Sequence, residues 1–318
     1  MKIIVLGSAA GGGFPQWNCN CRNCDGLRSG SIRATARTQS SIAVSKDGID
    51  WVLINASPDI LAQIRATPAL QPARGRRDTG IAAVMLMDAQ VDHVTGLLML
   101  REGKTLPLYC SASVWDELNT SLPLVPVLSH YCGVRWHPLE AVDGGPAMLP
   151  LEVPGIGGIR FTPLSLPSKA PPYSRRRTAP GVGVGDNIGL LIEDLEHGTT
   201  AFYAPGLGAI EPQVDAAMRK ADCVLVDGTF WRADEMIELG FSGKSAADMG
   251  HLPQSGPGGM IAVLDKLDAS PGAHGKRRRK ILIHINNTNP ILDEDSPQRA
   301  RLASHGIEVA CDGMEIAL

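Results

Sequence analysis

The sequence predicts an α/β protein in which two mixed β-sheets pack face to face with helices outside, an αββα sandwich. Segments typical of strands outnumber those typical of helices along the 318-residue chain. The helices come late and among pairs of strands, whereas a single doubly wound sheet would show strict βαβ alternation. With 44% hydrophobic residues and no shift in composition that marks a boundary, we expect one domain over residues 1–318.

Each predicted strand is a short apolar run bounded by Gly, Pro, Asn or Asp. In chain order these runs cover residues 2–7, 40–46, 50–56, 81–87, 106–111, 159–167, 187–194, 199–205, 223–230, 280–286, 307–312 and 314–318. The first helix-like stretch has Ser57 as its N-cap and Pro58 in its first turn. The six helix-like stretches are 57–66, 95–103, 113–122, 211–221, 258–267 and 296–306.

Charge and composition exclude several classes of protein. A net charge of −3 offers no general attraction to nucleic acid or anionic lipid. The basic segments 175–181 and 275–280 lie among Gly and Pro without aromatic residues that would stack bases, so we interpret both as solvated surface loops. We see no secretory signal and no apolar run of about 18 residues. We therefore expect a cytoplasmic protein that binds neither nucleic acid nor membrane.

The glycine-rich segment GSAAGGGFP at 7–15 follows the first predicted strand, as a phosphate-binding loop would. Its glycines match neither the dinucleotide fingerprint nor the P-loop pattern, and no amphipathic helix follows. We interpret the segment as a tight loop in which glycine lets two stretches of backbone approach each other. No nucleotide cofactor is predicted.

The chain has seven cysteines, an odd number that argues against a secreted disulfide framework, and three of them crowd into CNCRNC. The thiolates of Cys19, Cys21 and Cys24 lie in one predicted loop and can wrap one ion at about 2.3 Å, as tetrahedral zinc prefers. The alternative, three unpaired buried thiols, would place an arginine and two asparagines between apolar groups. We predict a structural zinc site whose fourth ligand comes from another part of the chain.

A second set of candidate ligands follows the apolar run IAAVMLM. Asp92 and His93 lie in a short polar loop at the end of this predicted strand, where functional sites are commonly built. An aspartate that opens a helix is often only its N-cap, which is the alternative role for Asp92. His284 lies within the predicted strand KILIHIN, where a polar ring in an apolar run needs a partner.

One carboxylate and two imidazoles make up the facial triad that leaves open positions on non-haem Fe(II). Asp92, His93 and His284 have this composition, although a single buried histidine is usually only a satisfied hydrogen-bonding group. The sequence therefore predicts that these three side chains converge on one redox-active metal.

The motifs KIIVLGSAAGGGFPQWNCNCRNC, LINASPDI, DAQVDHVTGLL, VLVDGTFW, DMGHLPQSG and LIHINNTNPIL resemble, in order and spacing, the pyrroloquinoline quinone (PQQ) biosynthesis protein B family. This family is a branch of the metallo-β-lactamase fold superfamily. The resemblance runs from residue 1 to residue 318, and the segments near 174–184 and 270–280 look like loop insertions. It implies an αββα sandwich with metals held at strand ends on one edge, in agreement with the fold predicted above.

The resemblance also shows which superfamily ligands this chain lacks. The usual H-x-H-x-D-H motif appears as Asp88-x-Gln90-x-Asp92-His93, and the later histidine and the bridging aspartate fall near 165–168 and 205–206, where no good ligand stands. A two-zinc hydrolase needs those groups to hold a pair of ions. His284 matches the final metal-ligand histidine of the superfamily, so one metal can still bind.

Two further positions gain a meaning from the resemblance. His251 matches a segment of related enzymes and is a candidate for proton transfer, with loop packing as its alternative role. Asn287 stands where a related phosphodiesterase has the histidine that completes its zinc site, so the fourth ligand here is a water, another side chain or Asn287 itself.

The resemblance implies a step in making PQQ from a cross-linked glutamate-tyrosine unit. Our leading hypothesis is a non-haem iron oxygenase in which Fe(II) and O2 hydroxylate the tyrosine ring, with a small-molecule or dipeptide-like precursor as partner. A metal-dependent hydrolase of a phosphoester or peptide is one alternative, and it requires two metals or a strongly activated water. A non-catalytic carrier of PQQ or its precursor is the other. A homodimer is left open.

Overall fold

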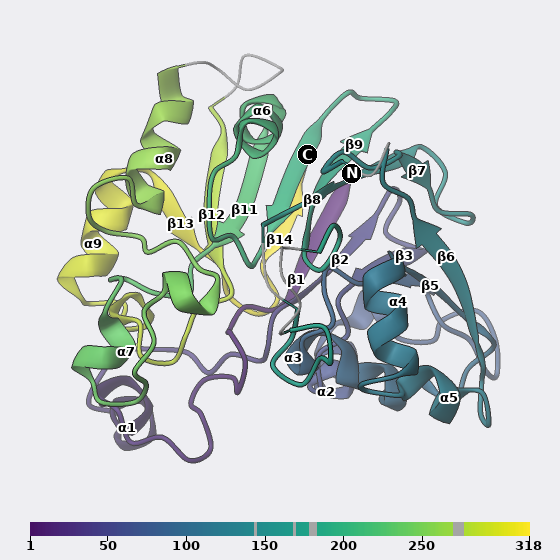
Figure 1. Cartoon of the computed structure of the whole chain (residues 1–318), viewed down its shortest axis with the longest axis horizontal. Helices are drawn as coiled ribbons and strands as arrows, with labels where there is room; N and C mark the ends of the chain where they lie inside the picture. The colour runs from purple at the N-terminus through teal and green to yellow at the C-terminus, as the bar shows by residue number, and fades with distance from the viewer. Residues whose placement is uncertain (143–144, 168–169, 178–182, 270–276) are drawn as a thin grey trace. The chain divides into compact units, whose positions relative to one another are not determined.

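The structure, a computed structural model, describes residues 1–142, 145–167, 170–177, 183–269 and 277–318 (Figure 1). The chain divides into two compact units. The first unit comprises residues 1–6, 41–199 and 313–318, and the second unit comprises residues 7–40 and 200–312. The single domain over residues 1–318 stays a prediction.

Seven strands of the first unit form one sheet. In chain order they are β1 (Lys2–Gly7), β2 (Ser41–Ser45), β3 (Trp51–Ile54), β4 (Ile81–Met85), β5 (Leu106–Ser111), β6 (Val134–Leu139) and β14 (Glu315–Ala317). Their order across the sheet is β14-β1-β2-β3-β4-β5-β6. β14 pairs antiparallel with β1 and β2 with β3, whereas β3, β4, β5 and β6 run parallel. All residues of β2 and β3 are buried, as expected of strands covered on both faces.

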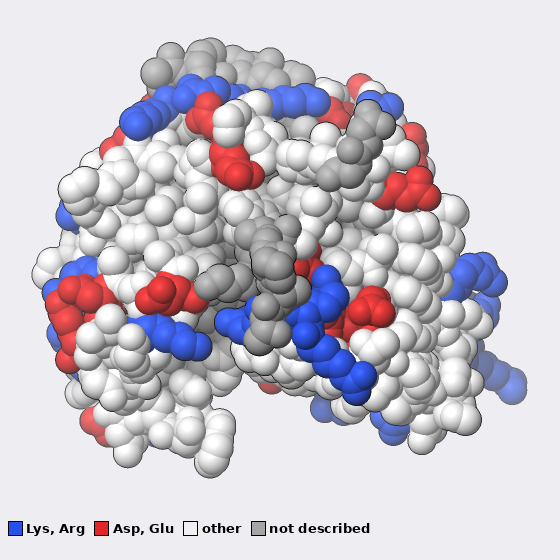
Figure 2. Space-filling model, in the orientation of Figure 1, with Lys and Arg blue, Asp and Glu red and all other residues white. Residues whose placement is uncertain are grey.

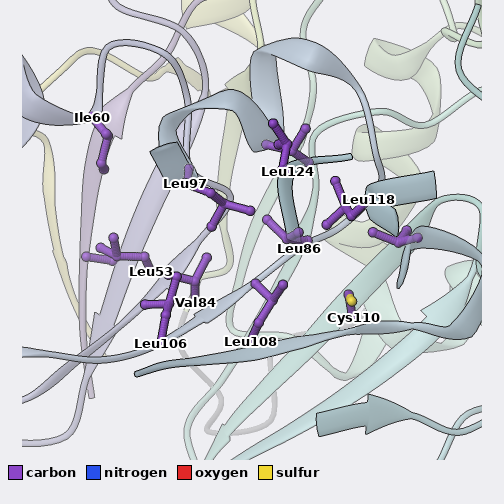
Figure 3. Close-up of a cluster of buried hydrophobic side chains, with 14 of the residues drawn as sticks. Leu53, Ile60, Val84, Leu86, Leu97, Leu106, Leu108, Cys110, Leu118 and Leu124 are labelled. Carbon is purple, nitrogen blue, oxygen red and sulfur yellow. The ribbon is translucent and has the colours of Figure 1, made fainter. Parts of the chain in front are cut away.

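Short helices of the first unit pack against this sheet (Figure 1). They are α2 (Ile60–Ala66), the 3₁₀ helices η1 (Pro68–Leu70) and η2 (Thr95–Leu100), α3 (Val91–Val94), α4 (Ala112–Asn119) and α5 (Leu124–Leu128). Figure 3 shows the apolar core that results, with Leu53, Val84 and Leu108 of the sheet near leucines of the helices. Because burying one leucine contributes roughly 1.5–3 kcal/mol, this core stabilises the strand ends on which the candidate residues stand.

Three further strands of the first unit, β7 (Leu151–Glu152), β8 (Ile159–Ser165) and β9 (Ile188–Asp194), pair antiparallel. In β8 buried and half-buried residues alternate, the pattern of a strand with one covered face. The start of β9 lies against the segment that follows β4. The Ile188 N–H donates to the Met87 carbonyl at 2.9 Å, and Asp88 and Asn187 form an antiparallel bridge.

The second unit contains a block of four parallel strands in the order β13-β12-β11-β10. The strands are β10 (Thr200–Ala204), β11 (Cys223–Asp227), β12 (Arg279–Ile283) and β13 (Ile307–Val309). Helices α6, α8 and α9 lie beside these strands (Figure 1). The helices of this unit are α1 (Arg22–Ser29), α6 (Pro212–Lys220), α7 (Glu235–Glu238), α8 (Met260–Lys266), α9 (Pro297–Ser304) and the 3₁₀ helices η3 (Ala247–Met249), η4 (Leu267–Ala269) and η5 (Pro290–Leu292).

Every strand predicted from the sequence is present, but several elements differ from expectation. β6, β7, α1, α3, α5 and α7 were not predicted, and the loop expected at Asp92 and His93 is wrong because both residues lie in α3. The stretch 95–103 contains a 3₁₀ helix instead of an α-helix, because the Gly96 N–H donates to the Ala56 carbonyl at 2.9 Å outside the helix. α2 begins only at Ile60, since the Ser57 hydroxyl accepts the Asp59 N–H at 3.3 Å and caps no longer helix.

The interpretation of the basic segments as solvated loops is wrong for part of the second one. Arg278 is buried, and its guanidinium donates to backbone carbonyls, while the buried Lys280 pairs with Asp268 at 2.7 Å. In the first segment, Arg176 pairs with Glu117 and Asp186, each at 2.9 Å. Residues 178–182 and 270–276 lie outside the described part of the chain. Figure 2 shows that basic and acidic side chains are both present on the face of the molecule that it draws.

Replacing Gly96 by alanine tests how closely η2 approaches the segment after β3. A Cβ atom at Gly96 would lie 2.1 Å from the Ser57 carbonyl oxygen and 2.7 Å from that of Ala56. Since backbone must shift to relieve such contacts, we expect Gly96→Ala to lower the free energy of unfolding by about 1–3 kcal/mol in a denaturant titration. Gly103→Ala is the control, because its nearest new contact is 3.7 Å. Equal stability of the two variants would contradict the expectation.

Candidate functional site

The segment that carries Asp88 and His93 leaves the end of β4 and is held by hydrogen bonds within the first unit. The Met87 N–H donates to Oδ1 of Asn55 at 3.0 Å, and the hydroxyl of Tyr173 donates to the carbonyl of Ala89. Asn55 has a φ of 65°, a left-handed conformation that asparagine tolerates better than most residues. These bonds position the segment before α3 begins.

His93 is a buried imidazole between two carboxylates. Its Nδ1 atom lies 2.8 Å from Oδ1 of Asp88, and its Nε2 atom lies 3.7 Å from Oδ2 of Asp92. Burial by itself would lower the pKa of His93, but the negative charges of Asp88 and Asp92 and the hydrogen bond to Asp88 outweigh it and raise the pKa to about 9. Asp92 stands in the first turn of α3, whose N-cap is Gln90, so the alternative role of Asp92 as N-cap is wrong.

His284 and His251 come together in the second unit around Asp227 and Thr229. The Nδ1 atom of His251 lies 2.6 Å from Oδ2 of Asp227 and 3.1 Å from the Thr229 hydroxyl. The same hydroxyl lies 2.9 Å from both Nδ1 and the carbonyl oxygen of His284. The two rings stack with their centroids 5.4 Å apart, and His284 has a φ of 61°. A non-glycine residue with positive φ at a strand end often marks a functional site.

Asp227 is the buried carboxylate at the end of β11. Burial would raise its pKa, but the charge of His251 and the hydrogen bonds that it accepts from His251 and from the Leu207 N–H lower the pKa below its ordinary value. The carboxylate is therefore ionised. One ligand atom each from Asp227, His251 and His284 lie within 4.8 Å of one another, so this group has the composition of a cation site.

The three cysteines lie together in the second unit, and Asn287 lies among them. One Sγ atom from each of Cys19, Cys21 and Cys24 lies within 4.8 Å of the others, and Nδ2 of Asn287 is 3.1 Å from Cys19, 3.7 Å from Cys21 and 3.4 Å from Cys24. Burial raises the pKa of Cys21 to about 12. Holding Cys21 as a thiolate therefore requires a positive charge beside it.

The predicted cysteine loop is wrong in one respect. Cys21 is the N-cap of α1, its sulfur accepts the Cys24 N–H at 3.5 Å, and Cys24 lies in the first helical turn. The helix start brings the two sulfurs to the same side of the backbone.

Two residues of the site were not identified from the sequence as functional. Asp227 and Thr229 organise both histidines of the second unit, yet the sequence analysis gave them no role. A signal was present, since Asp227 ends the buried run CVLVD in the same way that Asp88 follows IAAVMLM. Of the positions near 165–168, Ser165 accepts the Gly185 N–H through its hydroxyl, and residue 168 lies outside the described part.

None of the helices in the described part of the chain has the length and apolar character that crossing a membrane requires. The cytoplasmic location and the homodimer stay predictions.

Comparison with known proteins identifies the fold class. The β-lactamase superfamily domain matches residues 50–285. The crystal structure of Zn(2+)-bound PqqB from Methylobacterium extorquens matches with a TM-score of 0.87 over 100% of both chains, at 36% sequence identity. With two mixed sheets flanked by helices, the chain has the metallo-β-lactamase fold, and this prediction is confirmed.

Its curated relatives narrow the class further. Coenzyme PQQ synthesis protein B of Cupriavidus necator is 65% identical over 318 residues, which cover 100% of this chain and 99% of that protein. The protein of the same name from Azoarcus sp. is 60% identical over 319 residues, which cover 100% of both. The chain belongs to the coenzyme PQQ synthesis protein B family, as its motifs predicted, and its role lies in PQQ biosynthesis.

The Asp88–His93 pair predicts a pH dependence for the metal-free protein. Because the pKa of His93 is raised from its ordinary value of about 6.5 to about 9, the pair's contribution to the free energy of unfolding is fully present below pH ~6.5 and is lost as the pH rises through about 9. Asp88→Asn should lower the NMR titration midpoint of His93 and remove most of this dependence.

Glu102→Gln is the matched control, because the Glu102 side chain is 71% exposed, and it should change neither quantity. A wild-type midpoint near 6.5 would contradict the prediction.

Proposed function

We propose that this chain hydroxylates the tyrosine ring of a glutamate-tyrosine-derived PQQ precursor with Fe(II) and O2, and that Asp92, His93 and His284 hold the iron. The observation that carries the proposal is how the two histidines are held. Each has its Nδ1 atom within hydrogen-bond distance of an oxygen, Asp88 at 2.8 Å for His93 and Thr229 at 2.9 Å for His284. Metal-binding histidines are held in this way, through the nitrogen that does not bind the metal.

The donor set fits iron. Asp92 adds a carboxylate 3.7 Å from Nε2 of His93, so one carboxylate and two imidazoles are provided, which is the ligand composition of non-haem Fe(II) oxygenases. When bound, Fe(II) would supply the O2 activation that ring hydroxylation needs.

His251 is the proposed proton-transfer residue. Its Nδ1 atom is held by the ionised Asp227 at 2.6 Å, which favours the charged imidazolium and lets the ring hold a proton for transfer. The alternative is a packing role, since the ring lies edge-on to Phe230 with centroids 5.7 Å apart and the His251 N–H donates to the Ala246 carbonyl. A loss of turnover in His251→Gln without a loss of metal would support proton transfer.

We further propose that Cys19, Cys21 and Cys24 hold a structural zinc ion. Three clustered sulfurs suit zinc, and the PqqB structure from Methylobacterium extorquens is described as Zn(2+)-bound. Asn287, whose amide lies 3.1 Å from the sulfur of Cys19, is the nearest candidate for the fourth position, because exchanging its amide N and O would present an oxygen to the ion.

The oxygenase proposal is tested by reconstitution without air. Protein loaded with Fe(II) is mixed with the precursor, a two-electron reductant and isotope-labelled O2, and the product is examined by mass spectrometry. We expect one labelled oxygen atom in the product and no labelled product with His284→Ala. His130→Ala, at an exposed histidine, is the control and should behave as wild type.

The alternatives predict different results. A hydrolase would show two zinc ions beyond the cysteine site and esterase activity without oxygen consumption. A carrier would bind the precursor or PQQ without any gain in oxygen mass. Either result contradicts the proposal.

The zinc proposal predicts separate behaviour of the two metal sites. Cys24→Ser should remove about one zinc ion per chain and lower stability, because the buried sulfur of Cys24 is lost from the ligand set. Cys132→Ser, at a partly exposed cysteine away from the cluster, is the matched control. Metal analysis and thermal unfolding measure both effects. Unchanged zinc content in Cys24→Ser would contradict the assignment.

A further inference from the structure

We propose that Thr229 is the positioning residue that fixes the ring tautomer of His284, so that its proton sits on Nδ1 and the lone pair on Nε2. The inference rests on the proposed function only where it concerns metal binding by His284. The tautomer itself is a property of the metal-free protein and is tested there.

Counting protons at the Thr229 hydroxyl leads to this tautomer. A hydroxyl has one proton to donate and two lone pairs to accept with. A carbonyl oxygen only accepts, so the 2.9 Å contact to the His284 carbonyl uses the hydroxyl proton. The second 2.9 Å contact, to Nδ1 of His284, then requires the ring to be the donor. In a neutral ring with a proton on Nδ1, Nε2 has the lone pair.

The neighbouring histidine supports the same assignment. Nδ1 of His251 lies 2.6 Å from Oδ2 of Asp227, an oxygen that also accepts the Leu207 N–H, so we assign a proton to this nitrogen as well. At 3.1 Å from the Thr229 hydroxyl, this N–H is a second donor that faces the oxygen of Thr229. The Thr229 hydroxyl therefore accepts from the ring N–H groups of His251 and His284 and donates its own proton to the His284 carbonyl oxygen.

The backbone around Thr229 is held firmly enough to act as a reference for the ring. The Thr229 N–H donates to Oδ1 of Asp227 at 2.9 Å, and the Gly228 N–H donates to the Ile283 carbonyl at 2.7 Å. The Asn286 N–H donates to the Thr229 carbonyl at 3.1 Å. The ends of β11 and β12 are thus connected on both sides of His284, whose positive φ turns its carbonyl toward the hydroxyl.

The other tautomer would place a proton on the nitrogen that the proposed function assigns to the metal. Metal binding would then have to exchange that proton between the two nitrogens and break the bond to Thr229. Loss of a group that orients a histidine ligand typically weakens metal affinity 10–100-fold. Thr229 contributes to metal affinity in this way without contacting the metal itself.

The first test is NMR of metal-free protein with nitrogen-labelled histidine. We expect the wild-type ring of His284 to have its proton on Nδ1. Thr229→Ser keeps the hydroxyl and should keep this tautomer, whereas Thr229→Val keeps the shape, lacks the hydroxyl and should show a substantial fraction of the Nε2–H form. A wild-type spectrum with the proton on Nε2 would overturn the proposal without any variant, and so would an unchanged tautomer in Thr229→Val.

The second test is titration with Co(II), followed by its visible absorption, on protein whose cysteine site is already filled with zinc. We expect Thr229→Val to bind 10–100-fold more weakly and Thr229→Ser to bind within a few-fold of wild type. Retained zinc shows that the variant is folded. If His284→Ala binds Co(II) as wild type does, the proposed function fails, while the tautomer result stands on its own.

Discussion

A buried imidazole has two nitrogens that each need a partner: one donor and one acceptor when the ring is neutral, and two acceptors when it is charged. In this protein the partner of Nδ1 is provided by an oxygen at each of three buried or half-buried histidines. Asp88 serves His93, Thr229 serves His284 and Asp227 serves His251. These hydrogen bonds help to fix the orientation of each ring, together with the stacking of His251 on His284 and the contact of His251 with Phe230.

These oxygens are in place because buried strands end where polar groups begin. β4 and β11 are apolar strands, and Asp88 and Asp227 stand where these apolar runs end. Burial of the strands therefore places each carboxylate at a strand end. The backbone then departs from regular geometry near both sites, at Asn55 with a φ of 65° and at His284 with a φ of 61°. Such conformations persist only where the surrounding structure stabilises them. At Asn55 the side-chain oxygen accepts the Met87 N–H, and this hydrogen bond helps to hold the residue in place.

Elements with a local sequence pattern were predicted correctly. Elements that depend on packing against distant parts of the chain were not predicted. β4, β11 and β12 can be recognised in the sequence because strands covered on both faces consist of nearly continuous apolar residues. β6 cannot, because it contains Arg135, His137 and Pro138, and an edge strand tolerates such residues. The 3₁₀ geometry of η2 depends on a hydrogen bond to Ala56, which lies far back in the chain and has no local signature.

The candidate ligands were predictable for a similar reason, whereas the groups that orient them were not. Cysteines and histidines are rare enough for their spacing to be informative. A threonine such as Thr229 is common, and its role appears only when β11 and β12 bring it to 2.9 Å from His284. The role of Asn287 likewise depends on a fold that places it among cysteines more than 260 positions away.

The hydrogen bonds of Asp227 show that its carboxylate has a structural role at the histidines of the second unit. Asp227, His251 and His284 have the composition of a second cation site, but the carboxylate is already engaged. Oδ1 accepts the Thr229 N–H at 2.9 Å, and Oδ2 accepts the Leu207 N–H at 2.9 Å and the Nδ1–H of His251 at 2.6 Å. A cation that displaced one of these bonds would do so in a buried environment, where each lost bond costs roughly 1–3 kcal/mol. The same carboxylate therefore holds both His251 and the backbone of Thr229 in place.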